Sequence, residues 1–201
     1  MSLPGLETVP KSLVARRPEF IENEALERYL EFGKSTDVWD KYNTGSPWDG
    51  RIIHFGDMPV TMEDSIIGVL LAVKAAIKAE YRLADEIYPD DFTLVRWLTE
   101  DYHEPHADSV NPGGQPHPFS WRKYTAIIYL NQDFEGGDLC FPTKNIRVKP
   151  EPRALVFFPG TLEYLHEVEK ITAGTRYTLA SFWTNDQTKS IYPKIFRSGW
   201  E

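Results

Sequence analysis

The chain has 201 residues, 41% of them hydrophobic and 26% charged, with a formal net charge of −8 and a sequence pI near 5.2. This length suits one domain with its own core, and the acidic balance argues against a nucleic-acid binder, which needs a basic surface. The single cysteine, Cys140, excludes an intramolecular disulfide, and no apolar run is long enough to span a membrane. We therefore expect a cytoplasmic protein with no nucleic-acid and no membrane partner.

Two helices are predicted first. Residues 23–32 form a short amphipathic pattern, and Gly33 suits the C-terminal cap of that helix. A stronger pattern begins at residues 61–64, which resemble a capping box, and it carries apolar residues at helical spacing: Ile66, Leu70, Val73 and Ile77. We expect both helices to buttress a sheet; a partner-binding role is the alternative.

From Phe92 onward, short β-rich runs alternate with turn residues such as Gly136-Gly137 and Pro159-Gly160. The predicted strands are Thr93–Leu98, Tyr124–Leu130, Asp138–Phe141, Arg147–Lys149, Ala154–Phe158, Glu163–Val168 and Arg176–Trp183. Many short strands at close spacing favour an antiparallel sandwich or barrel, and a jelly roll is the leading candidate. We expect a mainly β (α+β) single domain over residues 1–201, with a helical part at 1–90, a jelly-roll core at 91–185 and a tail at 186–201.

A His-x-Asp motif lies at His106-Ala107-Asp108, where an extended strand would place both side chains on one face. His166 is a candidate third ligand on a later strand. Two imidazoles and one carboxylate leave three open positions on an octahedral metal, as in non-haem iron(II) oxygenases. Taken alone, His-x-Asp can be an ordinary surface pair, so the hypothesis depends on the residues that follow it.

Arg176 lies ten residues after His166, on a run whose shared face would carry Thr178, Ala180 and Phe182. Burying an arginine among such neighbours is costly unless an anion meets it. The far carboxylate of a dicarboxylate would do so with bidentate geometry. A strand-end arginine that reaches solvent or a salt bridge is the alternative.

These residues resemble the prolyl 4-hydroxylases and hypoxia-sensing prolyl hydroxylases, which belong to the 2-oxoglutarate/Fe(II)-dependent dioxygenases. The resemblance runs from about Phe92 to Trp183. Its motifs are Tyr-His-Glu-Pro-His-Ala-Asp at 102–108, Arg122 with Thr125 and Tyr129-Leu130-Asn131, Glu135-Gly136-Gly137-Asp138, Phe141-Pro142, His166-Glu167-Val168 and Thr175-Arg176-Tyr177. It implies a double-stranded β-helix with helices on one side, and Fe(II), 2-oxoglutarate and O2 as cofactor and cosubstrates, with ascorbate as a candidate reductant.

Carried over to this chain, the resemblance implies iron ligation by His106, Asp108 and His166. It implies that Arg176 and Tyr129 bind the far carboxylate of 2-oxoglutarate, with Thr178 beside them. Two departures concern aromatic positions, since Trp97 replaces a family tyrosine and Phe182-Trp183 stand where the family has a tryptophan. We interpret Trp97 as a core aromatic.

On the substrate side, Arg122 matches a family position at the entrance, although a solvated strand-end arginine fits as well. Phe182 and Trp183 are the candidates for the substrate wall, and strict alternation would turn Phe182 into the pocket and Trp183 away from it. We expect the turn-rich segment from Ser109 to Trp121 to be a lid, because it follows the second ligand directly; a disordered surface loop is the alternative.

The implied reaction is hydroxylation of an unactivated C–H bond, with a prolyl residue in a peptide or protein as the favoured substrate. Asp108 favours hydroxylation over halogenation, because a halogenase leaves that coordination position free for chloride. Hydroxylation of a free amino acid or small metabolite is one alternative, and a catalytically silent jelly-roll binding module is another. The other histidines, His54, His103 and His117, are predicted to be surface or loop residues, and residues 85–91 a solvated acidic corner.

Overall fold

The computed structural model describes residues 14–41, 44–111, 113, 115 and 117–192. Its α-helices are α1 (Asn23–Ser35) and α2 (Glu63–Glu80). Its strands are β1 (Ala15–Arg17), β2 (Ile52–His54), β3 (Tyr88–Trp97), β4 (His103–His106), β5 (Tyr124–Tyr129), β6 (Phe134–Gly136), β7 (Leu139–Phe141), β8 (Ile146–Val148), β9 (Leu155–Pro159), β10 (His166–Val168), β11 (Ile171–Gly174) and β12 (Arg176–Thr184). Among the described residues, no helix has the length and apolar character needed to cross a membrane.

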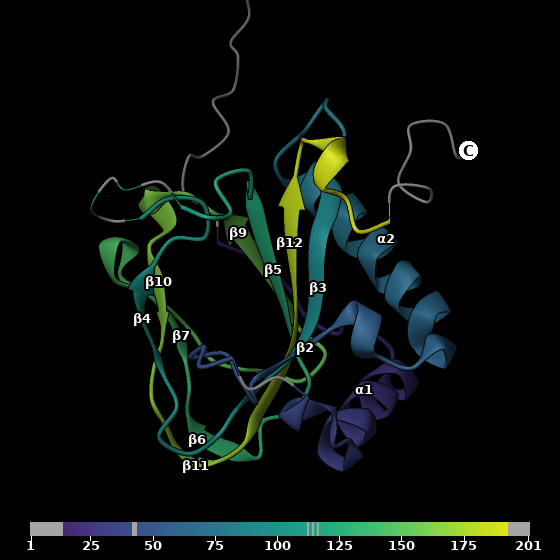
Figure 1. Ribbon diagram of the computed structural model, residues 1–201. Coiled ribbons are helices and arrows are strands. Elements are labelled where there is room, and N and C mark those ends of the chain that lie inside the picture. The colour runs from purple at the N-terminus through teal and green to yellow at the C-terminus, as the bar shows by residue number, and fades with distance from the viewer. Residues whose placement is uncertain (1–13, 42–43, 112, 114, 116, 193–201) are drawn as a thin grey trace, which may run out of the picture.

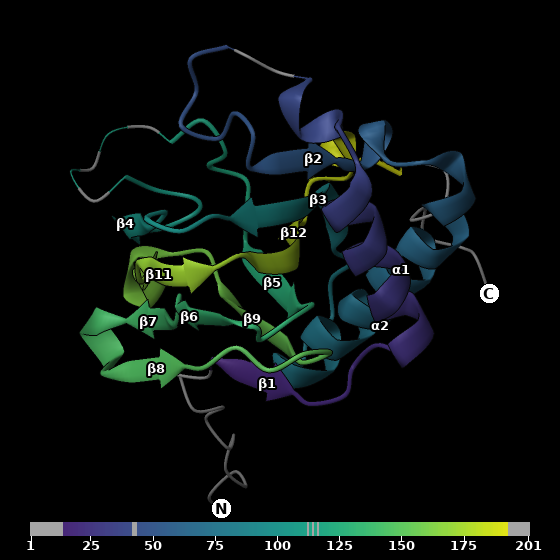
Figure 2. The ribbon, with the colours of Figure 1, turned by 90° about the horizontal axis from the view of Figure 1, so that it is seen from below.

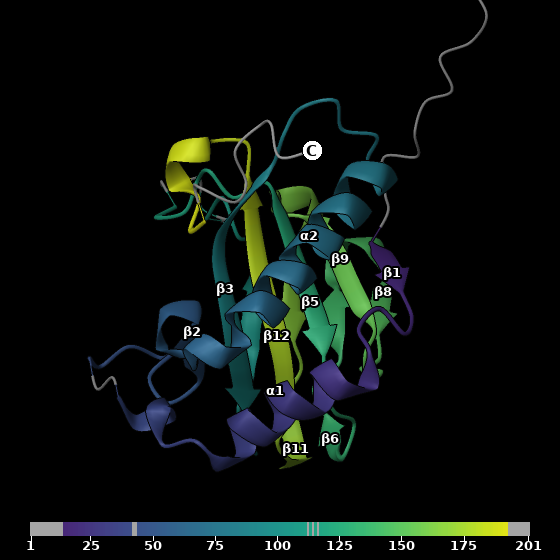
Figure 3. The ribbon, with the colours of Figure 1, turned by 90° about the vertical axis from the view of Figure 1, so that its right-hand side faces the viewer.

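The strands form three antiparallel sheets. The largest has the order β1-β9-β5-β12-β3-β2, the second has the order β4-β10-β7-β8, and β11 pairs with β6 in a two-stranded ribbon. Figure 1 shows the two larger sheets facing each other, and α1 and α2 cover the outer face of the six-stranded sheet (Figures 1 and 3). Figure 2 shows the same layers from below. The predicted mainly β, antiparallel architecture with N-terminal helices is confirmed, and it is consistent with a jelly roll.

The six-stranded sheet separates two cores, because successive residues of a strand point to opposite faces. The core under the helices contains the apolar face of α2 that the sequence predicts, together with Leu179 and Trp183 of β12. The core between the sheets contains Val95, Trp97 and Tyr129. The alternation along β12 therefore decides which side chains reach the space between the sheets.

The helix ends differ from the sequence predictions. Gly33 lies inside α1 rather than at its cap. A Cβ at this position would lie 3.1 Å from Leu94 Cδ2, so the absence of a side chain permits close packing of the helix on the sheet. The capping box is also absent. Residues 60–62 form a 3-10 turn, and no side chain caps the start of α2.

Two strand predictions need correction. The predicted strand Glu163–Val168 begins with a 3-10 turn at residues 162–164, and only β10 pairs in the sheet. The extended strand that was expected to carry both His106 and Asp108 ends at His106, so Asp108 follows β4. The short strands β1, β2, β6 and β11 were not predicted. Each has three or four residues, which is too short for a periodic pattern to emerge.

Candidate active site

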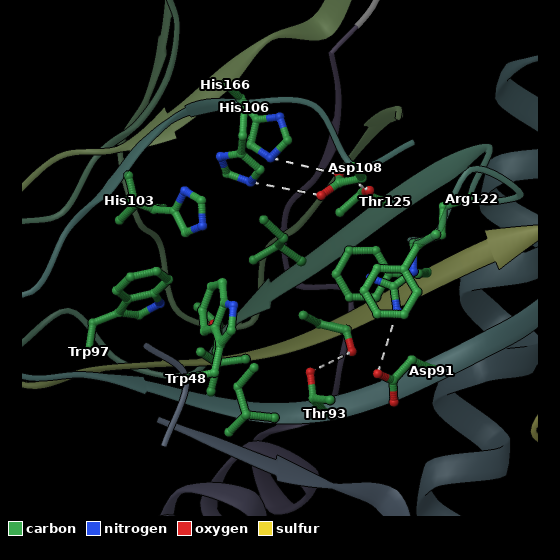
Figure 4. Close-up of a pocket in the computed structure, with 18 of the residues that line it drawn as sticks. Trp48, Asp91, Thr93, Trp97, His103, His106, Asp108, Arg122, Thr125 and His166 are labelled. Carbon is green, nitrogen blue, oxygen red and sulfur yellow. Dashed lines mark hydrogen bonds and ion pairs between the residues drawn. The ribbon is translucent and has the colours of Figure 1, made fainter. Parts of the chain in front are cut away.

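The side chains of His106, Asp108 and His166 converge between the two sheets. Antiparallel pairing of β4 with β10 places His106 opposite His166, and their ring centroids lie 4.3 Å apart. One ligand atom from each of the three residues lies within 4.8 Å of the others. Asp108 offers one oxygen to each imidazole, with Oδ1 at 3.8 Å from His106 Nε2 and Oδ2 at 3.8 Å from His166 Nε2 (Figure 4).

Both imidazoles are oriented by backbone carbonyls. His106 Nδ1 lies 2.8 Å from the Glu104 carbonyl oxygen, and His166 Nδ1 lies 3.0 Å from that of Tyr164. A carbonyl oxygen can only accept, so each Nδ1 carries the proton and each Nε2 presents its lone pair toward Asp108. This is the arrangement by which histidine ligands are held and their tautomer fixed in metal sites.

The protonation states suit a divalent metal. Burial, and then the neighbouring His166, lower the pKa of His106 to about 4, and burial lowers the pKa of His166. Burial opposes ionisation of Asp108, but the two imidazoles and a hydrogen bond from Thr125 hold its pKa below the ordinary value. Two neutral imidazoles and one carboxylate are therefore ready to bind a metal at neutral pH.

Arg176 and Tyr129 are buried in the same region, and several of their polar atoms lack hydrogen bonds to the described residues. Arg176 is 1% exposed and Tyr129 is fully buried. Among the described residues, Arg176 Nε, Arg176 Nη2 and the Tyr129 hydroxyl have no hydrogen-bond partner. Burial lowers the pKa of Arg176 and raises that of Tyr129. Because such groups are costly when unpaired, they fit an anionic ligand with at least two acceptor oxygens.

A cavity of about 820 Å³ is lined by the three residues of the triad and by Arg176. Thr178, Ala180 and Phe182 line it from β12, as the alternation on that strand predicts, and Thr125 and Ile127 line it from β5. Trp97 is buried in the core between the sheets and also lines the cavity, which agrees with its interpretation as a core aromatic.

Of the two candidates for the substrate wall, Trp183 does not belong to it, as strict alternation along the strand predicts. It is fully buried in the core under the helices, where its indole Nε1 donates a hydrogen bond to Ser181 Oγ. Its neighbour Phe182 lines the cavity. The physical reason is that β12 pairs with β5 without a break there, so adjacent residues keep opposite faces.

His54 is exposed and His117 lies in a loop, as predicted, whereas His103 lies in β4, and all three histidines line the cavity. His103 lies 3.8 Å from His106, ring centroid to ring centroid. His54 Nδ1 lies 3.3 Å from Asp91 Oδ1, and that hydrogen bond raises the pKa of His54. Spacing along the chain could not reveal these positions, since distant segments bring them together.

The predicted acidic corner is only partly solvated. Asp90 has a side chain that is 4% exposed, and Asp91 lines the cavity. Both carboxylates contact Arg122, which is itself buried. Arg122 is thus neither the solvated strand-end residue nor a free cation at the entrance.

Two residues at the site were missed in the sequence. Trp48, on the loop before β2, stacks on His103 at 5.1 Å between ring centroids and lines the cavity. Nothing in its local sequence indicates this role. Thr125 lines the cavity, and its hydroxyl donates to Asp108 Oδ2, a contact that its place in the strand motif does not indicate.

The segment predicted as a lid is described in part. Pro112, Gly114 and Pro116 lie outside the described residues. On its N-terminal side, the Ser109 amide and hydroxyl both donate to the Gly160 carbonyl oxygen. On its C-terminal side, residues 117–122 form hydrogen-bonded turns. The lid function stays a prediction.

Comparison with known proteins finds a matching family model and similar sequences. The model of the 2OG-Fe(II) oxygenase superfamily matches residues 92–184. Human prolyl 3-hydroxylase 3 is 36% identical over 94 residues, which cover 41% of this chain and 13% of the relative. The 2-oxoglutarate and iron-dependent oxygenase domain-containing protein 3 of Xenopus tropicalis is 37% identical over 97 residues, covering 46% and 28%. The chain therefore spans less than a third of the length of these relatives.

Two solved structures share the fold. The viral collagen prolyl hydroxylase of Paramecium Bursaria Chlorella virus-1, in its 2OG complex, aligns with a TM-score of 0.67 at 16% identity, covering 88% of this chain and 97% of that one. A Pseudomonas putida prolyl-4-hydroxylase aligns with a TM-score of 0.64 at 18% identity, covering 85% and 91%. Residues 92–184 thus match the 2OG-Fe(II) oxygenase superfamily, and the chain shares the fold of two prolyl hydroxylases of known structure.

Proposed function

We propose that this chain is an Fe(II)- and 2-oxoglutarate-dependent dioxygenase that hydroxylates a prolyl residue within a peptide or protein. The observation that carries the proposal is that one cavity is lined by a His-Asp-His triad and by Arg176. The buried Nε and Nη2 of Arg176 and the hydroxyl of its neighbour Tyr129 have no hydrogen-bond partner among the described residues. A binding module with this fold would need neither group. We also interpret the two facing sheets as the halves of a double-stranded β-helix.

The residues present fit both absent groups. His106, Asp108 and His166 would hold Fe(II), and Arg176 with the Tyr129 hydroxyl would bind the far carboxylate of 2-oxoglutarate, with Thr178 on the same strand face. When bound, the metal and cosubstrate activate dioxygen, so that one oxygen atom enters the substrate C–H bond while 2-oxoglutarate becomes succinate and carbon dioxide.

The protein's own contribution is to position these groups and to exclude water. Carbonyl oxygens fix the imidazoles, and Thr125 fixes the carboxylate. Apolar side chains line the cavity around the triad: Val95, Leu139 and Val168. Such walls keep the dielectric low and strengthen the charge pairing at Arg176.

The charges of the cavity favour a residue inside a polypeptide over a free amino acid. Among the described residues that line it, the arginines and lysines are Arg122 and Arg176. Arg122 is already paired with Asp90 and Asp91, and Arg176 is assigned to the cosubstrate. A free α-carboxylate would find no remaining cation, whereas a residue with amide bonds on both sides needs none. The choice of a prolyl residue rests on the similar proteins, which are named as prolyl hydroxylases.

The test is reconstitution of the full chain with Fe(II), 2-oxoglutarate and ascorbate. Succinate would be followed by NMR in the presence of a library of proline-containing peptides, free proline and other free amino acids. We expect succinate coupled to the gain of one oxygen atom on a peptidyl proline. Coupled turnover with a free amino acid would support the small-molecule alternative, and the absence of iron-dependent succinate would support the silent binding module.

A further inference from the structure

Arg122 lies between two aromatic rings at the opposite end of the cavity from Trp97 (Figure 4). Its Cζ lies 3.9 Å from the ring centroid of Phe119 and 3.7 Å from that of Phe182. These distances place the guanidinium against both rings, and its side chain is 9% exposed. Stacking of this kind uses the planar faces of the guanidinium, which a lysine does not have.

The edges of the same guanidinium are occupied by carboxylates. Arg122 Nε lies 3.0 Å from Asp90 Oδ2, and Nη2 lies 3.6 Å from Asp91 Oδ2. Consecutive strand residues normally point to opposite faces. Here the β3–β12 register shifts between Phe182 and Trp183, which pair with Asp91 and Pro89, so Asp90 is the additional residue of a bulge. The bulge allows both carboxylates to reach one cation.

Asp90 also connects the turn that carries Phe119 to the sheet. The Trp121 indole Nε1 donates to Asp90 Oδ2 at 2.7 Å, and the Arg122 amide donates to the Phe119 carbonyl oxygen at 2.9 Å. Asp90 Oδ1 is buried and has no hydrogen-bond partner among the described residues. The buried charge of the Asp90 carboxylate is therefore stabilised by Arg122 and by Trp121. Loss of either partner weakens the attachment of the turn at residues 117–122 to the sheet.

We infer that Arg122 is a positioning residue that holds Phe119 and Phe182 together as one aromatic wall of the substrate end. The wall, rather than the guanidinium, would contact the substrate, since Phe119 is 40% exposed while Arg122 is covered on both faces. Such a wall suits an apolar ring in the substrate and offers no ionic contact. This inference rests on the proposed function for its substrate and on the geometry alone for its positioning role.

The positioning role is tested by hydrogen–deuterium exchange on the full chain. Arg122→Lys keeps the charge but loses the planar faces, and Arg122→Gln loses the charge. We expect faster exchange of residues 117–122 in both variants, with unchanged exchange of β5 and unchanged circular dichroism. Arg28→Lys, at an exposed site on α1, is the matched control. Unchanged exchange of residues 117–122 in both variants would overturn the inference, whatever the substrate is.

A double-mutant cycle tests the route by which Arg122 acts on the substrate. The probe is the proline-containing peptide that gives the highest coupled turnover. We expect Arg122→Lys and Phe119→Ala each to raise the KM for the peptide at least about tenfold, with an unchanged half-saturating concentration of 2-oxoglutarate. Because the two residues act together, the double variant should be no worse than the poorer single variant.

Additive losses of peptide binding would show that Arg122 contacts the substrate directly and would overturn the inference. The substrate and the positioning role of Arg122 are tested separately. If no peptide is hydroxylated by the unmodified chain, the proposed prolyl substrate is wrong, while the exchange measurement still decides whether Arg122 positions the wall.

Discussion

The Thr125 hydroxyl donates a hydrogen bond to Asp108 Oδ2, and both residues are buried. Thr125 comes from β5 of the six-stranded sheet, whereas His106 and His166 come from the facing sheet. The bond fixes the rotation of the carboxylate and leaves Oδ1 facing His106. The geometry of the triad thus depends on a residue that would itself not touch the metal.

Replacing this threonine should weaken metal binding without unfolding the protein. Thr125→Val keeps the shape and removes the donor, so we expect the affinity for Fe(II), or for Co(II) as a stable probe, to fall about 10–100-fold. Chelator competition measures it. Thr93→Val is the control, because Thr93 is a buried residue of the same cavity that donates weakly to the Ala180 carbonyl oxygen. Equal affinities in both variants would contradict the role of Thr125.

Removal of any one triad side chain should abolish iron binding at neutral pH. We expect this for His106→Ala, Asp108→Ala and His166→Ala, each with a retained fold, since two remaining ligands do not form a stable site. Iron stoichiometry after anaerobic loading is the measurement. His54→Ala, at the rim of the same cavity, should bind iron normally. Full iron content in the triad variants would show that the metal is held elsewhere.

Arg176→Ala should raise the half-saturating concentration of 2-oxoglutarate and leave metal binding nearly unchanged. Loss of one buried charge-assisted pair costs about 2–5 kcal/mol, which corresponds to a factor of roughly 30 or more. Tyr129→Phe should show a smaller loss, on the order of 1 kcal/mol. Thermal stabilisation by 2-oxoglutarate with Mn(II) gives a readout independent of turnover. An unchanged stabilisation in Arg176→Ala would place the carboxylate elsewhere.

The metal-free protein should lose stability as the pH falls from about 6.5 toward 4. Burial, then His166, lower the pKa of His106 to about 4 from 6.5. Between these values the unfolded chain binds a proton that the folded chain does not, so acid favours unfolding, by about 2 kcal/mol at pH 5. Urea unfolding at pH 7.5 and pH 5, with a chelator present, measures this loss. His106→Gln should lose correspondingly less, and an equal loss in both proteins would contradict the assignment.

Gly136, the last residue of β6 at the turn toward β7, should not tolerate a side chain. Gly136 has a φ of +76°, and a Cβ there would lie 2.1 Å from the Lys170 carbonyl oxygen in the backbone of the facing segment. Gly136→Ala should therefore cost about 3 kcal/mol or more in the free energy of unfolding. Gly68→Ala is the matched control, since nothing lies within 4 Å of its Cβ in α2. It should stabilise by about 0.5–1 kcal/mol. Similar values for both variants would contradict this account of the turn.

Sequence reasoning succeeded where a short-range pattern carries the structure. The apolar face of α2 and the cavity face of β12 follow from periodicities of a few residues, which neighbouring residues alone define. It failed where an irregularity decides the geometry. The bulge at Asp90 brings two consecutive carboxylates to Arg122, and no alternating pattern could have indicated it.

By itself, the sequence determined the chemical identities at the site: two histidines and an aspartate with ligand spacing, and an arginine on the face of a predicted strand. These are local properties, fixed by residue type and strand periodicity. The tertiary structure alone decided which distant segments share the cavity. It brought Trp48 onto His103 and enclosed Arg122 between two rings. Such contacts depend on sheet register and on the packing of loops remote in the chain, and no local pattern encodes them.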